Sequence, residues 1–295
     1  MLKGIAAGFL AYGFFSTSDA ASKALGARLS VFEILFFLTL ASFSTYAFAK
    51  PADESWSDVF RFNRPRLVLL RNASGIVGSF FGVYSFTTLP LAEAYSLLFL
   101  MPAFVTILSI PMLGEQVGWR RWLAVLVGFA GVLLVVRPGF RELHLGHLTA
   151  IVAACCGALS LILLRMIGRT EKRISLLTAL YVMALIADGA LMVFDFKVPN
   201  WREVGIFTLG GFVGGIGQIA MLKATRLAPS NRIAPAQYSQ IIWAIIFGAV
   251  FFGDFPDAIA FLGIALVIAS GMFTFFREEQ LYGWSRRTFL MRSRQ

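Results

Sequence analysis

The chain has 295 residues, of which 58% are hydrophobic and 14% are charged, and its mean hydropathy is +0.76. This composition excludes a soluble globular protein and indicates an integral membrane protein. The formal net charge of +10 comes from basic residues scattered over many loops rather than gathered on one face. It therefore favours contact with anionic lipid over a nucleic-acid partner.

Ten apolar segments follow one another from the N-terminus with short loops between them. A helix needs about 20 apolar residues to cross a hydrocarbon core of about 30 Å, and ten segments have approximately this length: 2–25, 31–49, 67–88, 91–113, 122–136, 145–166, 174–194, 204–222, 233–252 and 258–276. The first contains Asp19 and Lys23, which the uncharged core of a cleaved signal peptide would not contain. We expect it to remain as a helix of the mature protein.

The basic residues predict the orientation in the membrane. Most of the 26 Lys and Arg residues fall in alternate loops, and short loops rich in these residues stay in the cytoplasm. This pattern predicts a multi-pass protein of the bacterial inner membrane with both termini in the cytoplasm. Residues 278–295 form a basic cytoplasmic tail that we expect to contact the inner leaflet.

The sequence contains an internal repeat of about half its length. A shift of 139 positions aligns Gly75 with Gly214, Gly78 with Gly217, Pro90 with Pro229, Gly114 with Gly253 and Glu115 with Asp254. A slightly different offset aligns Gly4 with Gly146 and Lys23 with Arg165. We expect an all-α integral membrane protein built from two five-helix repeats, 1–140 and 141–277. Because five is odd, the repeats are inverted, as in alternating-access carriers, although a symmetric fold could also form a channel.

Several short motifs recur in one family of transporters. They are Leu-Gly-Glu-Gln-Val at 113–117, Arg-Trp-Leu-Ala-Val at 121–125, Gly-Phe-Ala-Gly at 128–131, Arg-Pro-Gly at 137–139 and Leu-Pro-Leu-Ala-Glu-Ala at 89–94. With the two-fold five-helix layout, they make the whole chain resemble the EamA-type transporters of the drug/metabolite transporter superfamily. The second half keeps only Gly253 and Asp254 of the turn motif. Within the family, the Asp-Ala-Ala-Ser-Lys segment at 19–23 is similar to exporters of amino acids, including YddG-type exporters of aromatic amino acids.

The resemblance implies a central substrate cavity lined by the first, third, fourth, sixth, eighth and ninth spans. Asp19 is the first candidate, because an ionised side chain inside the bilayer is costly and often functional. It would bind a substrate ammonium group or exchange a proton. Alternatively, Asp19 and Lys23 form a structural ion pair near the rim, since they are four residues apart on one helix.

The fourth and ninth spans contain the richest group of polar and aromatic residues. Such residues suit an amphipathic small molecule, although they could also lie at the membrane interfaces or bond to neighbouring helices. The candidates for the cavity wall are Tyr12, Ser16, Asp19, Asn72, Tyr84, Tyr95, Phe99, Gln218, Gln237, Tyr238 and Trp243.

A second group of residues is expected to act in packing or gating. Small residues let helices approach closely, and this group contains Gly78, Gly82, Gly214 and Gly217. Pro102 is expected to kink the fourth span. Glu93 either closes an outer gate or is a solvated acid at a helix start, and Glu115 and Asp254 are interpreted as structural acids at helix starts.

Enzyme chemistry finds no support in the sequence. His144 and His147 fall in the outward loop after the fifth span, and the adjacent Cys155 and Cys156 are expected to pack as small apolar residues. No metal, cofactor or nucleotide site is predicted. The sequence therefore predicts a secondary transporter that exports small amphipathic metabolites, most simply aromatic or neutral amino acids. The alternatives are an importer or exchanger of a larger planar metabolite, such as a vitamin or nucleoside derivative, and a channel. The predicted partners are that small molecule and the lipid bilayer, and the oligomeric state is left open.

Overall fold

The computed structural model describes residues 2–273 apart from 50–54, 60, 116, 139–141, 169 and 229–232. The predicted basic tail, 278–295, lies outside the described residues. Over the described part the regular structure is helical. The long helices are α1 (Leu2–Leu25), α2 (Val31–Ala49), α3 (Pro65–Thr88), α6 (Trp119–Val136), α7 (Leu145–Ile167), α8 (Arg173–Met192), α9 (Trp201–Leu227) and a last helix at Ala258–Phe273. Two further segments are interrupted: α4 (Leu91–Leu98) precedes α5 (Met101–Leu113), and η3 (Ala234–Tyr238) precedes α11 (Ser239–Phe247) and η4 (Gly248–Phe252). Short turns are η1 (Trp56–Asp58) and η2 (Val193–Asp195).

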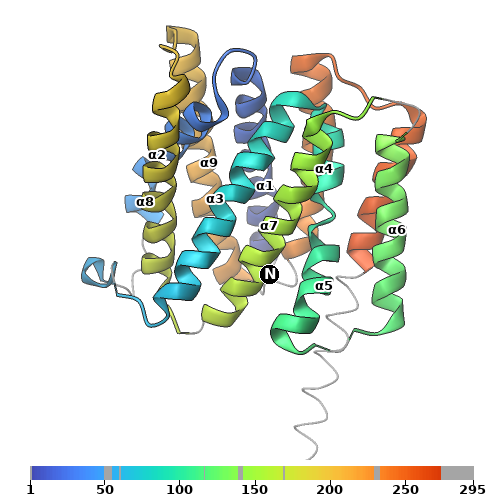
Figure 1. Ribbon diagram of the computed structural model, residues 1–295, viewed down its shortest axis with the longest axis horizontal. Helices are drawn as coiled ribbons and strands as arrows, with labels where there is room; N and C mark the ends of the chain where they lie inside the picture. The colour runs from blue at the N-terminus through green and yellow to red at the C-terminus, as the bar shows by residue number, and fades with distance from the viewer. Residues whose placement is uncertain are drawn as a thin grey trace, which may run out of the picture.

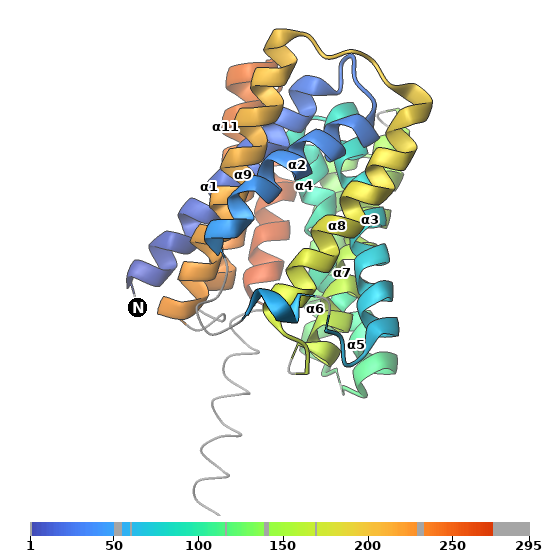
Figure 2. The same ribbon diagram turned by 90° about the vertical axis from the view of Figure 1, so that its left-hand side faces the viewer.

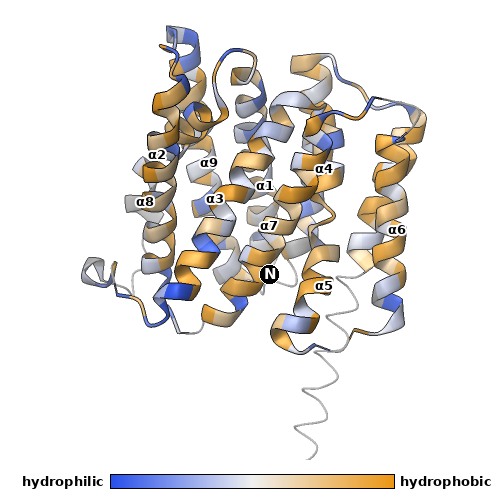
Figure 3. Cartoon of the chain, in the orientation of Figure 1, coloured by the Kyte–Doolittle hydropathy of each residue, from blue (hydrophilic) through white to orange (hydrophobic). Residues whose placement is uncertain are grey.

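Six helical segments are long and apolar enough to cross a membrane: Pro65–Thr88, Leu91–Leu113, Leu145–Ile167, Arg173–Asp195, Trp201–Thr225 and Pro235–Phe252. Shorter apolar helices occur at Val31–Thr45, Trp122–Val136 and Ala258–Phe273. Large apolar side chains such as Leu126, Leu148 and Ile186 point outward and are more than half exposed. Hydrophobic residues cover much of the helices, whereas hydrophilic residues concentrate near their ends (Figure 3). An apolar outer surface of this extent needs lipid around it, so the chain is a multi-pass membrane protein.

The helix ends follow from local chemistry. Pro65 occupies the first turn of α3, where a missing N–H costs nothing. A capping box begins α9, because the Glu203 N–H donates to Asn200 Oδ1 at 2.9 Å and the Asn200 N–H donates to Glu203 Oε2 at 2.7 Å. Gly114 ends α5 and Gly253 ends η4, both in the left-handed conformation that favours glycine, with φ of 68° and 69°.

The fourth and ninth spans are not the continuous helices that the sequence predicts. The fourth breaks at Phe99 and Leu100, and Pro102 lies in the first turn of α5 rather than at the centre of a kink. The ninth begins as the 3₁₀ turn η3, which contains Pro235, and ends as the π turn η4. Pro102 lies at the start of α5 and Pro235 at the start of η3, where a missing N–H costs little.

The helices form a single bundle in which two long pairs cross (Figures 1 and 2). α1 packs along α9, and α3 packs along α7. α6 lies at one edge of the bundle (Figure 1). It packs closely against the last helix, because a Cβ atom added to Gly131 would lie 2.7 Å from the carbonyl oxygen of Gly263. Buried apolar residues of α4, α6, α7, α11 and the last helix form the largest hydrophobic cluster.

Candidate functional site

A cavity of about 390 Å³ lies between α1, α2, α3, α8 and α9; we call it the central cavity. Its lining residues are Phe15, Ser18, Asp19, Ser22, Leu35, Leu38, Thr39, Ser42, Ser79, Gly82, Val83, Phe86, Tyr181, Gly214 and Gln218. Among these described residues Asp19 has the only carboxylate, and none is a lysine, arginine or histidine. The wall therefore combines one acid with hydroxyl groups and aromatic rings, which suits a small molecule with a polar head and an apolar body.

Asp19 belongs to a polar group that joins α1, α4 and α11 through the Tyr95 hydroxyl. Tyr95 of α4 donates its hydroxyl hydrogen to Asp19 Oδ2. The hydroxyl oxygen of Tyr95 also lies 3.4 Å from Ser16 Oγ and 3.4 Å from Gln240 Nε2, which donates to it. Tyr95, Ser16 and Gln240 are buried. This group fixes the Asp19 carboxylate at the cavity wall.

A row of aromatic rings continues from Tyr95. Its ring centre lies 5.2 Å from that of Phe86 and 6.3 Å from that of Phe99, and the rings of Phe99 and Tyr238 stack at 5.0 Å. Phe86 lines the central cavity, whereas Phe99 and Tyr238 lie behind Tyr95. The row connects the broken fourth and ninth spans. Tyr95, Phe99 and Tyr238, which the sequence analysis expects in the cavity wall, are not among the residues that line the central cavity.

Other predicted wall residues lie away from the central cavity. Asn72 is fully buried on α3 and donates to Met183 Sδ at 3.3 Å. Trp243 is 36% exposed, stacks on Phe247 and lies against Gly13. A final set, Tyr12, Tyr84 and Gln237, is partly exposed and does not line the cavity either. Of the predicted wall residues, Gln218 and Asp19 line the central cavity.

The glycines chosen for packing lie at helix crossings. An added Cβ atom at Gly217 would lie 2.8 Å from Phe15, at Gly214 it would lie 3.1 Å from Ser18 Oγ, and at Gly78 it would lie 3.1 Å from Cys156 Cβ. Gly82 is less confined, with its nearest neighbour, Ala153, at 3.9 Å. Gly82 and Gly214 also line the central cavity, so packing and cavity shape are linked there.

The expected pairing of Asp19 with Lys23 is wrong. Lys23 Nζ lies 3.2 Å from Asp254 Oδ2 and donates to the Leu89 carbonyl oxygen at 2.6 Å. It also lies 5.2 Å from the centre of the Phe252 ring. A spacing of four residues makes a contact between Asp19 and Lys23 possible. In the structure Asp19 contacts Tyr95 instead, and Lys23 contacts Asp254. Asp254 is therefore the partner of Lys23. It lies in the segment after η4 and not at a helix start as the sequence analysis expects, because the last helix begins at Ala258, where Asp257 Oδ1 accepts the Ala260 N–H.

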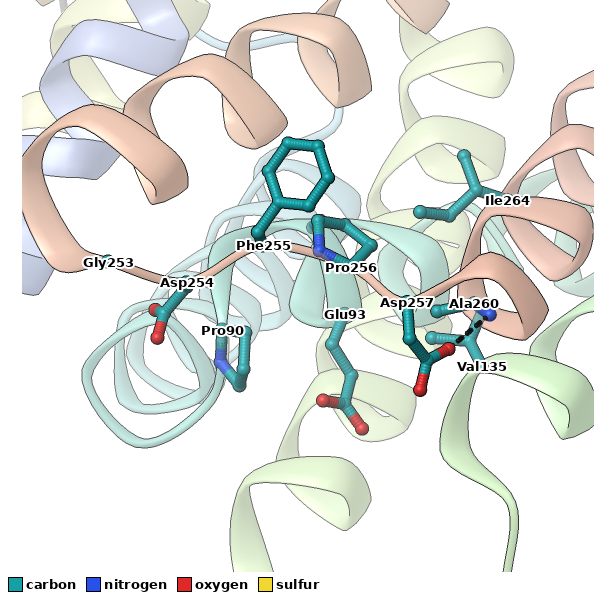
Figure 4. Close-up of a pocket in the computed structure, with 11 residues that line it drawn as sticks. Pro90, Glu93, Val135, Gly253, Asp254, Phe255, Pro256, Asp257, Ala260 and Ile264 are labelled. Carbon is teal, nitrogen blue, oxygen red and sulfur yellow. Dashed lines mark hydrogen bonds between the residues drawn. The ribbon is translucent and has the colours of Figure 1, made fainter.

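A smaller cavity of about 280 Å³, which we call the rim pocket, lies at the end of the bundle where α1 ends. Pro90, Glu93, Asp254 and Asp257 line it (Figure 4). Glu93 Oε1 lies 2.9 Å from His147 Nε2. His147 is buried in the first turn of α7, and not in a loop as the sequence analysis expects. Glu93 is thus neither a solvated acid nor isolated, because it contacts the other half of the chain.

The sequence analysis missed the hydroxyl groups of the central cavity. Ser18 and Ser22 are four residues apart on α1, and Thr39 and Ser42 are three residues apart on α2; Ser79 adds another on α3. Hydroxyls at helical spacing inside an apolar span are a detectable signal. Such residues do not by themselves indicate a binding site, because burial of serine or threonine costs little free energy when the hydroxyl bonds to the preceding turn.

Among the described residues there is no group of three His, Cys, Asp or Glu residues that could hold a metal ion. The chemistry available at the central cavity is recognition by charge, hydrogen bonding and aromatic contact.

Comparison with known proteins agrees with this arrangement. The model of the EamA-like transporter family matches the chain twice, over residues 2–137 and 144–276. The S-adenosylmethionine uptake transporter of Rickettsia bellii is 24% identical over 265 residues, covering 90% of each chain. The pseudopaline exporter CntI of Pseudomonas aeruginosa is 25% identical over 273 residues, covering 90% of this chain and 94% of the exporter.

Two further likenesses are partial or concern the fold. The riboflavin transporter of Vibrio cholerae is 26% identical over 185 residues, or 62% of each chain. A solved crystal structure superposes with a TM-score of 0.65 and 17% identity, covering 94% of this chain and 98% of that one. Because the family model covers nearly the whole described chain, the protein belongs to the EamA-like transporter family.

Proposed function

We propose that this transporter is an inner-membrane carrier that exports small amphipathic metabolites with an ammonium group, and that aromatic and neutral amino acids are the first substrates to test. The observation on which this proposal depends is the Asp19 carboxylate, fixed by Tyr95 in the wall of the central cavity. The hydroxyl group of Ser18 offers a hydrogen bond to the substrate carboxylate, and Phe86 offers an apolar surface to its side chain.

The substrate would move by alternating access between two inverted repeats, 1–140 and 141–277. Reciprocal packing supports these repeats: the first helix of each half packs along the third helix of the other, as α1 does with α9 and α7 does with α3. The separate matches of the family model to each half also support them. Exchange of conformation between such halves is how inverted-repeat carriers open on alternate sides.

The turns after the fourth and ninth spans give independent support. Gly114 and Gly253 have φ values of 68° and 69°. In the first half the N–H of Glu115 donates to the Ser109 carbonyl oxygen at 3.3 Å; in the second the N–H of Asp254 donates to the Gly248 carbonyl oxygen at 2.9 Å. All three positions are related by the shift of 139 residues that the sequence analysis used.

In this account both termini are cytoplasmic, so the rim pocket faces the periplasm. Gly78, Gly82, Gly214 and Gly217 would be the surfaces on which the helices slide, and Pro102 marks the break around which α4 and α5 move relative to each other. Glu93, which contacts His147 across the two halves, would help to close the periplasmic side.

The second candidate function is import or exchange of a larger planar metabolite. Its support is that relatives of this chain are named as transporters of S-adenosylmethionine and riboflavin. The cavity of about 390 Å³ lies near the lower end of the range for small-molecule pockets, about 300–1,000 Å³, which favours the smaller substrate.

Flux measurements with the purified chain in proteoliposomes separate the two functions. The panel contains radiolabelled amino acids, S-adenosylmethionine and riboflavin, each measured with and without a pH gradient. Saturable flux of Phe or Trp supports the first proposal. Flux of only the larger compounds supports the second, and conductance that does not saturate would indicate a channel.

A further inference from the structure

The contact between Lys23 and Asp254 joins the two halves at one end of the bundle. Lys23 is in the last turn of α1, and Asp254 follows the left-handed Gly253 after η4. The pair is partly buried, with the two side chains 13% and 31% exposed. It lies between the central cavity, which Asp19 lines one turn earlier on α1, and the rim pocket, which Asp254 lines.

The opposite end of the bundle contains a second set of residues in equivalent positions. Arg165 is two residues from the end of α7, as Lys23 is two residues from the end of α1. Glu115 follows the left-handed Gly114, as Asp254 follows Gly253. The ends of α5 and α7 meet in one hydrophobic cluster that includes Leu113 and Met166. The end of α5, which Glu115 follows, and the end of α7, which contains Arg165, therefore lie at the same end of the bundle.

One kind of contact between the halves is formed at both ends of the bundle in the same conformation. At one end Arg28 pairs with Glu203, and this carboxylate raises the pKa of the guanidinium. At the other end Lys172 pairs with Asp58 at 2.6 Å, and Glu171 accepts the Arg64 N–H at 2.6 Å. These contacts link the loop after the first helix of each half to the loop before the third helix of the other half. Because they are formed at both ends in the same conformation, we call them static links and use them as a control.

We propose that Lys23 with Asp254 and Arg165 with Glu115 are two alternating latches. In the present conformation Lys23 and Asp254 close the end of the bundle where α1 ends. When the two halves exchange conformations, this pair separates, and Arg165 pairs with Glu115 to close the other end. Each latch thus stabilises one of the two states between which the carrier alternates. The inference depends on the proposed alternating access, but it does not depend on the identity of the substrate.

The test measures from which side the central cavity is accessible. Thr39 lines the cavity, so Thr39→Cys in a full-length Cys155→Ala/Cys156→Ala background provides a single reactive thiol. A membrane-impermeant maleimide is added to intact cells or to inverted membrane vesicles, and the initial labelling rates from the two sides are compared. Lys23→Gln and Asp254→Asn should shift the ratio of the rates by about 5- to 30-fold toward the side that the present structure closes. Arg165→Gln and Glu115→Gln should shift it in the opposite direction.

Two control variants test whether the shift in labelling rates comes from the proposed pairs. Arg28→Gln breaks a static link and should leave the ratio of the rates unchanged. The exchanged pair, Lys23→Asp with Asp254→Lys, should restore the parental ratio, which shows that the single variants fold and act through the pair. The proposal is overturned if both latch sets shift the ratio in the same direction, or if neither shifts it. Absence of amino-acid flux with opposite shifts would contradict the proposed substrate and leave the latches supported.

Discussion

Replacement of Asp19 is expected to weaken substrate binding, and more strongly when the whole carboxylate is removed than when only its charge is removed. Asn keeps an oxygen that can accept the Tyr95 hydroxyl hydrogen, so Asp19→Asn removes little more than the negative charge toward the cavity. Asp19→Ala removes the charge and the hydrogen-bond acceptor together. A comparison of the two variants therefore separates the contribution of charge from that of the whole side chain.

The magnitude follows from the contact that the substrate ammonium would make. A hydrogen bond to a charged group contributes about 1.5–3 kcal/mol and a neutral one about 0.5–1.5 kcal/mol. The difference of about 1–1.5 kcal/mol predicts that Asp19→Asn raises the half-saturation concentration about 5- to 13-fold. Complete loss of the charged bond predicts about 13- to 160-fold for Asp19→Ala.

The assay is exchange of radiolabelled Phe in proteoliposomes over a range of concentrations. The matched control is Asp188→Asn, because Asp188 is 3% exposed on α8 and does not line the central cavity. It should leave the half-saturation concentration within about twofold of the parental value, a free-energy change below about 0.5 kcal/mol. The reasoning is refuted if both Asp19 variants retain the parental value, or if Asp188→Asn has the same effect as Asp19→Asn.

Three further outcomes are expected. If Asp19 exchanges the coupling proton, Asp19→Asn abolishes transport driven by a pH gradient and spares substrate exchange at saturating concentration; equal loss of both would contradict that role. Gly211→Ala places a Cβ atom 2.4 Å from Ala41 Cβ and 2.7 Å from a backbone oxygen of α2, so it should destabilise the protein by about 1–3 kcal/mol and lower its Tm. Gly205→Ala on the same helix meets nothing within 4 Å and should not destabilise the protein; similar Tm values for the two variants would refute the packing argument. Lys172 holds the pKa of Asp58 below its ordinary value, so the stabilising contact is complete above the ordinary pKa, about 3.9, and is lost as the pH falls through the lowered pKa. Thermal unfolding of parental protein and Asp58→Asn between pH 7 and pH 3 checks this, since the difference in Tm should shrink on acidification.

Hydropathy predicts the helices well where one apolar stretch forms one helix. The first two predicted spans coincide with the bounds of α1 and α2. It fails inside the fourth and ninth spans, because average hydropathy does not distinguish a continuous helix from two shorter ones. Pro102 signals an interruption, but the break lies at Phe99 and Leu100, where the chain needs a turn before the proline can begin a new helix.

The polar partners within the bundle are harder to predict. Sequence spacing pairs Asp19 with Lys23. In the structure Asp19 accepts a hydrogen bond from Tyr95, and Lys23 forms an ion pair with Asp254. These partners are more than 70 residues away along the chain, so only tertiary packing brings them together. The contact of His147 with Glu93 is also a tertiary one, since it comes from the approach of α4 to α7.

The most direct test of the central claim is saturable flux through the purified chain. Proteoliposomes loaded with unlabelled Phe are placed in radiolabelled Phe, and accumulation by exchange is followed in the parental protein and in Asp19→Ala. The account predicts saturable accumulation of Phe that the variant loses over the same concentration range. Failure to exchange any amino acid, with saturable exchange of S-adenosylmethionine or riboflavin, would contradict it.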